Sequence, residues 1–137
     1  MDQPYFVTWY LPGRVIYARI QRQLEGEEPA QIDQLLCNLL DEGERAYLIM
    51  DLRDVAEMKN PSLARLDHVT YRHHPNLQWM LILTTDQVMH FLSTAVSQMA
   101  HKSYRVFSDT GELILFLKKN LPDADWNQVQ NDYLIAE

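Results

Sequence analysis

Cysteine and glycine are both scarce in this chain of 137 residues, which contains one cysteine and four glycines. A single cysteine, Cys37, excludes an intramolecular disulfide and favours a reducing compartment. The glycines lie too far apart for a dinucleotide-binding fingerprint or a phosphate-binding loop, which need closely spaced glycines where backbone approaches phosphate. The standard nucleotide-binding classes are therefore not expected. The glycines are Gly13, Gly26, Gly43 and Gly111.

Long apolar runs are also missing. The longest, Trp79–Leu83 and Leu113–Leu117, fall far short of the roughly 20 residues that span a bilayer. The N-terminus, Met1-Asp2-Gln3-Pro4 followed by Tyr5, is acidic and then aromatic, without the basic start and apolar stretch of a signal peptide. We therefore expect a cytoplasmic protein with no membrane span.

Positive charge is in short supply as well. Lys and Arg number 12 against 19 Asp and Glu, so the formal net charge is −7. Nucleic-acid binding depends on neutralising phosphates with basic side chains, and anionic membrane surfaces attract basic segments. The only adjacent basic pair is Lys118-Lys119. Neither nucleic acid nor an anionic membrane surface is expected as a partner.

Two segments at the start predict an antiparallel hairpin. Tyr5–Leu11 is rich in aromatic and β-branched residues and ends at Pro12-Gly13, a turn signal. The next segment, Arg14–Ile20, alternates in the manner of a strand. One face carries Val15, Tyr17 and Arg19, and the other carries Ile16, Ala18 and Ile20.

Apolar residues at helical spacing then alternate with short apolar runs. The first helix has Pro29 in its first turn and ends at Gly43, a residue that suits a C-terminal cap. A second helix begins with Asn60 as N-cap and Pro61 at its first position. The predicted apolar face of the first helix comprises Ile32, Leu35, Leu36, Leu39 and Leu40.

Two more helices and three more strands are predicted. Thr85 or Asp86 caps the third helix, and Asp109 caps the fourth, with Glu112 three residues on as in a capping box. Each of the short apolar runs is long enough for a buried strand. These strands are Ala46–Leu52, Leu77–Leu83 and Tyr104–Phe107.

The predicted order is thus β-β-α-β-α-β-α-β-α, an α/β fold with a mixed, mostly parallel sheet, an N-terminal antiparallel hairpin and about four helices. Residues 1–121 form one domain and residues 122–137 a C-terminal tail. Trp126, Val129 and Tyr133 share one face of a short helix in that tail. Trp126 either pins the tail to its own domain or anchors a dimer or partner contact.

The segment Asp51-Leu52-Arg53-Asp54 follows a predicted parallel strand, where open α/β sheets place ligands. Its carboxylates are candidates for holding Mg²⁺ or for acid–base work. The alternative that we favour is that both cap turns and pair with Arg53, because Asp is a standard turn former.

Other reactive residue types offer no recognisable constellation. The five histidines lack the spacing of a helical metal motif, and His73-His74, which precede Pro75, are expected at a helix end. Cys37 lies mid-helix among leucines and is expected to be structural. We therefore predict no catalytic residue, no metal site and no cofactor.

Five segments have a recognisable pattern beyond the element order: Asp51–Val55, Met58–Leu63, Asn76–Thr84, Ser103–Phe107 and Asp109–Leu117. With that order they resemble the STAS domain, the fold of bacterial anti-sigma factor antagonists. The chain is most similar to the divergent SpoIIAA-like group, and the resemblance covers roughly Val7 to Leu121. The resemblance implies a non-catalytic regulatory module, with a partner docking at the loop before the second helix and at that helix's N-terminus.

In this family a partner kinase phosphorylates a serine in an Asp-Ser-Ser-Gly stretch. Here that position falls on Asn60, and the family's Asp falls on Lys59. Ser62 is displaced by two positions, but a helix N-terminus favours phosphate, so Ser62 is the candidate phosphosite. The predicted docking surface comprises Met58, Lys59, Asn60, Ser62 and Arg65.

Three functions stay open from the sequence. The first is the docking module, with a regulatory kinase or anti-sigma-like protein as partner and a homodimer as an open alternative. The second is a carrier or sensor that binds an anionic or lipid-like small molecule at the strand ends, near Asp54 and Asn60. The third is an enzyme that uses Asp51 and Asp54 with a metal.

Overall fold

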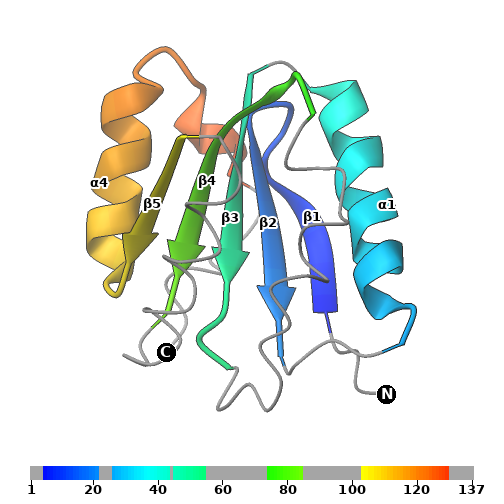
Figure 1. The fold of residues 1–137 in the computed structure, drawn as a ribbon. Helices are drawn as coiled ribbons and strands as arrows, with labels where there is room; N and C mark the ends of the chain where they lie inside the picture. Colours follow the sequence, from blue (N-terminus) through cyan, green and yellow to red (C-terminus); the bar gives the residue numbers. More distant parts are fainter. Residues whose placement is uncertain (1–4, 22–25, 44, 55–73, 85–102, 130–137) are drawn as a thin grey trace.

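The computed structural model describes residues 5–21, 26–43, 45–54, 74–84 and 103–129 (Figure 1). All five predicted strands are confirmed, with boundaries that agree to within one residue, and so are the first and last predicted helices. The second and third predicted helices lie outside the described residues. The elements are β1 (Tyr5–Leu11), β2 (Val15–Ile20), α1 (Glu28–Glu42), β3 (Ala46–Asp51), β4 (Leu77–Leu83), β5 (Ser103–Phe107), α4 (Thr110–Asn120) and the 3-10 helix η2 (Trp126–Gln128).

The strands form one sheet in the order β1-β2-β3-β4-β5, so neighbours in sequence are neighbours in space (Figure 1). β1 and β2 pair antiparallel, and every later pairing is parallel. The carboxyl ends of β2, β3, β4 and β5 therefore meet at one edge of the sheet. This mixed, mostly parallel α/β sheet is the fold class that the alternation of patterns predicts.

Helix α1 covers one face of the sheet. Its buried residues are spaced four apart, which places Ile32, Leu36 and Leu40 on one side of the helix. They pack against a strand face that includes Ile16 and Ala18 of β2. The predicted apolar face was too wide, because Leu35 is 41% exposed. A helix on a flat sheet buries a stripe, and Leu35 lies beside that stripe.

Helix α4 covers the opposite face, where Leu113 and Leu117 are fully buried. Its Phe116 ring meets Trp79 of β4 edge-on, with ring centroids 5.2 Å apart. The predicted N-cap is confirmed, since the Asp109 side chain accepts a hydrogen bond from the Glu112 backbone N–H at 3.2 Å.

Glycine occupies two positions near the β1–β2 turn, Gly13 and Gly43, for different physical reasons. Gly13 has φ +77°, a left-handed conformation that matches the predicted Pro-Gly turn. Gly43 ends α1 in an extended conformation, with φ −102°, so the left-handed cap typical of glycine is not used there. Instead, a Cβ at Gly43 would lie 2.8 Å from the Trp9 ring and 3.0 Å from the Gly13 carbonyl oxygen. Close packing against β1 selects this glycine.

The chain after α4 packs back on the same domain. The Trp126 indole N–H donates to the Leu121 carbonyl oxygen at 3.1 Å, and its ring packs against the core beneath α4 together with Val129. This contact matches the alternative in which Trp126 pins the tail to its own domain. Tyr133, the third member of the predicted face, lies outside the described residues. Within the part of the chain that the structure describes, no helix has the length and apolar character needed to cross a membrane.

Candidate functional site

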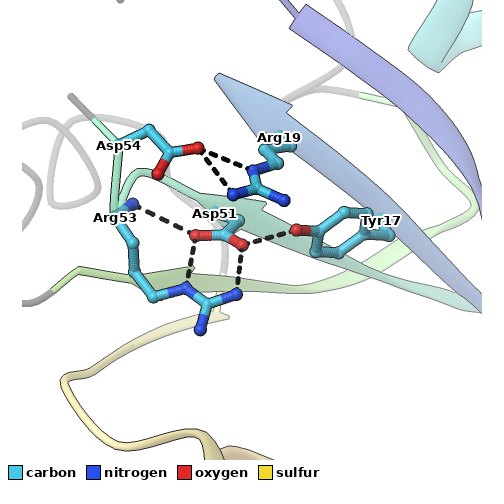
Figure 2. Close-up of polar contacts among 5 residues, drawn as sticks. All are labelled: Tyr17, Arg19, Asp51, Arg53 and Asp54. Carbon is cyan, nitrogen blue, oxygen red and sulfur yellow. Dashed lines mark hydrogen bonds and ion pairs between the residues drawn. The ribbon is translucent and has the colours of Figure 1, made fainter. Parts of the chain in front are cut away.

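Polar side chains converge where β2 and β3 end (Figure 2). Tyr17 and Arg19 are two residues apart on β2, so both point to the same face of the sheet. The parallel register places Arg19 opposite Asp51, the last residue of β3. Asp51 thus lies beside Tyr17 and Arg19, on the face that α4 covers further along.

Asp51 is 1% exposed, and both of its carboxylate oxygens accept two hydrogen bonds each. Oδ1 accepts from the Arg53 backbone N–H at 3.1 Å and from Arg53 Nε at 3.0 Å. Oδ2 accepts from Arg53 Nη2 at 2.8 Å and from the Tyr17 hydroxyl at 2.5 Å. A carboxylate offers about four acceptor sites, so these donors satisfy Asp51 completely.

Burial and pairing keep these three groups in fixed protonation states. Burial alone would raise the pKa of Asp51, but the hydrogen bonds from Arg53 and Tyr17 outweigh it and lower the pKa below its usual value. Burial, followed by the hydrogen bond to Asp51, raises the pKa of Tyr17. The hydrogen bonds to Asp51 raise the pKa of Arg53. None of the three is poised near neutral pH, where a general acid or base works best.

A second ion pair lies beside the first and nearer the solvent. Asp54 Oδ2 accepts from both Nε and Nη2 of Arg19, each at 2.7 Å. The side chains are 35% and 40% exposed, so this pair is a surface salt bridge of small energetic value. The prediction that both acids cap turns and pair with Arg53 is confirmed for Asp51. It is wrong for Asp54, because the β2–β3 register brings Arg19 within its reach.

The chemistry open to this arrangement is limited by its internal pairing. The negative charges of Asp51 and Asp54 are balanced by the positive charges of Arg19 and Arg53. The Asp51 oxygens already accept hydrogen bonds from Arg53 and Tyr17. Among the described residues, no group of three or more His, Cys, Asp or Glu side chains is arranged to hold a metal ion. The geometry can hold the chain in place where it leaves β3.

The predicted docking residues Met58, Lys59, Asn60, Ser62 and Arg65 lie outside the described residues. Asp54, the tentative ligand-binding residue, is the last described residue before them. The sequence prediction missed Tyr17 and Arg19 as members of the site. The signal for both was present in the alternation of β2, which placed them on one face. Their contacts to β3 depend on the register between strands.

The helix at whose end His73-His74 were predicted lies outside the described residues, but His74 itself is described. Its Nδ1 accepts a hydrogen bond from the Asn76 backbone N–H at 3.1 Å, so Nε2 carries the proton that faces Asp41 Oδ1 at 2.7 Å. The Asn76 side-chain amide also donates to the Leu40 carbonyl oxygen at 2.9 Å. Together these contacts tie the start of β4 to the end of α1.

Cys37 is half-buried on α1, with its Sγ 3.9 Å from Asp33 Oδ1. The described contact of this thiol is thus with a carboxylate on the same helix.

Comparison with known proteins finds no matching family model, no matching curated protein and no matching solved structure. The likeness to the STAS domain therefore stays a proposal.

Proposed function

We propose that the chain is a cytoplasmic, non-catalytic regulatory module of STAS type that docks a protein partner at the N-terminus of its second helix. The proposed contact residues are Met58, Lys59, Asn60, Ser62 and Arg65, with Ser62 as the proposed phosphosite.

One observation carries this proposal. At the carboxyl edge of the sheet, where α/β proteins keep their reactive groups, the ionisable side chains of β2 and of the β3 exit satisfy one another. Asp51, which is 1% exposed, accepts hydrogen bonds from Arg53 and from the fully buried Tyr17. Because these charged groups bind one another, they support a structural role for the carboxyl edge of the sheet. They do not favour a role in acid–base chemistry.

The element order adds support of a coarser kind. A hairpin followed by parallel strands fits the element order on which the resemblance rests. The balanced charges of Arg19, Asp51, Arg53 and Asp54 do not favour an anionic ligand at this point. Lys59 and Arg65 supply the cationic groups of the predicted surface, which fits a partner with acidic side chains.

The test starts with capture of partners from a lysate of the source cells by the tagged chain, followed by identification by mass spectrometry. The identified protein is then purified, and its Kd is measured by calorimetry against three forms of the chain. These are the natural sequence, the double variant Asn60→Ala/Arg65→Glu and the control Lys119→Glu. The control reverses a charge on the exposed C-terminal turn of α4.

We expect the double variant to weaken binding at least tenfold and the control to leave the Kd unchanged. Equal binding by all three forms contradicts the proposed surface. If no protein binds and native mass spectrometry instead finds a co-purifying small molecule, the carrier function replaces the docking module.

A further inference from the structure

The chain leaving β3 is held at three consecutive residues. The Leu52 backbone N–H donates to the Leu83 carbonyl oxygen at 2.8 Å and so extends the pairing with β4 beyond the strand itself. The Arg53 backbone N–H donates to Asp51 Oδ1, and the Asp54 side chain pairs with Arg19 of β2. Strands on both sides of β3 therefore determine the path of residues 52–54.

These three contacts differ in strength. The Arg19–Asp54 pair is exposed and screened by salt, so it opens easily. Asp51 is buried and accepts both the turn N–H and a two-point contact from the guanidinium of Arg53. Charge-assisted, two-point hydrogen bonds are the strongest and most directional of the common kinds. Asp51 is therefore the residue on which the path depends most.

Asp51 also joins that path to the sheet. Its Oδ2 accepts from Tyr17, which is fully buried in β2, so the carboxylate cannot rotate without breaking a contact to the neighbouring strand. Figure 2 shows the carboxylate between Tyr17 on one side and Arg53 on the other. A turn fixed in this way has a single orientation relative to the sheet.

We propose that Asp51 is a positioning residue: its carboxylate fixes the path of residues 52–54 at the exit of β3 and, through that path, strengthens partner docking without contacting the partner. The effect on docking rests on the proposed function. The effect on the path of the chain does not.

The first arm of the test is amide hydrogen exchange by NMR on the natural sequence, Asp51→Asn and Asp123→Asn. Asp123 is exposed and has no hydrogen bond or ion pair with the part of the chain that the structure describes, so its variant is the matched control. Loss of a hydrogen bond to a charged acceptor makes the Arg53 amide of Asp51→Asn exchange about tenfold faster, relative to Ile49 in the centre of β3. An equal acceleration at Arg53 and Ile49, or none at Arg53, overturns the inference, because a merely structural role changes only global unfolding.

Arg53→Lys is the second variant, in case Asp51→Asn does not fold. It keeps the charge but loses the two-point contact, and Arg53 is 19% exposed, so the change is tolerable. We expect a faster amide exchange at residues 53 and 54 in this variant as well. No acceleration there contradicts the positioning role of the carboxylate.

The second arm measures the Kd of the captured partner. We expect Asp51→Asn to weaken binding about tenfold and Asp123→Asn to leave it unchanged. If Asp51→Asn binds normally while Asn60→Ala/Arg65→Glu does not, the role of Asp51 in docking is refuted and the proposed function stands. If no partner exists, the proposed function fails, and the exchange arm alone decides the role of Asp51.

Discussion

Removal of the Tyr17 hydroxyl tests the energetics of the Asp51 contacts. Tyr17 is fully buried, and its hydroxyl donates to Asp51 Oδ2 at 2.5 Å. A hydrogen bond to a charged group contributes about 1.5–3 kcal/mol. In Tyr17→Phe, Arg53 still provides three donors to the carboxylate, so Asp51 stays partnered. We therefore expect Tyr17→Phe to lower the free energy of unfolding by an amount near the low end of this range, about 1.5 kcal/mol at pH 8.

The same contact predicts how this difference changes with pH. The pKa of Tyr17 is raised in the folded state, first by burial and then by Asp51. A raised pKa contributes stability that is fully present below the unfolded pKa of about 10 and is lost as the pH rises above it. At pH 11 the unfolded chain has ionised this tyrosine, which costs the natural sequence about 1.4 kcal/mol. Phenylalanine does not titrate, so the difference between the two proteins should nearly vanish.

Urea unfolding at pH 8 and pH 11, extrapolated to water, measures both values. Tyr104→Phe serves as the control at pH 8, because the Tyr104 hydroxyl makes no hydrogen bond to any of the described residues. Its cost should stay within about 0.5 kcal/mol. A Tyr17→Phe difference that is negligible at pH 8, or that persists unchanged at pH 11, refutes the reasoning.

Three further outcomes follow from the contacts of the fold. The pKa of Asp51 is lowered by its donors against the effect of burial, so its contribution is present above its unfolded pKa and lost as the pH falls below about 4. Acid unfolding of Asp51→Asn should lack this part of the pH dependence. Asn76→Ala removes the amide that bonds the Leu40 carbonyl and should cost about 1 kcal/mol in urea unfolding; no loss would contradict that bond. Leu36→Ala, at a fully buried position, should cost about 2–5 kcal/mol, whereas Leu35→Ala at a 41% exposed position should cost far less; equal losses would contradict the assigned face of α1.

The elements of this fold were predictable because their signals are local. Period-two alternation in β2 and the Pro-Gly turn before it depend only on neighbouring residues, and so does the Asp109 cap of α4. The prediction of the buried face of α1 was less accurate, because the exposure of Leu35 depends on how the helix packs on the sheet.

The contacts of the site were not predictable in the same way. Asp54 and Arg19 are 35 residues apart in sequence, and only the register of β2 against β3 brings them together. Gly43 shows the same limit. Its place at the end of α1 was predicted, but its physical reason is the approach of Trp9 from a distant strand. Long-range register and close packing carry no local sequence signal.

The central claim, a partner docked at residues 58–65, is tested most directly by NMR titration of the isotope-labelled chain with the captured partner. We expect the largest backbone chemical-shift changes at residues 52–66, with little change in α1 and α4. Changes centred on α4, or spread over the whole sheet, would contradict the claim.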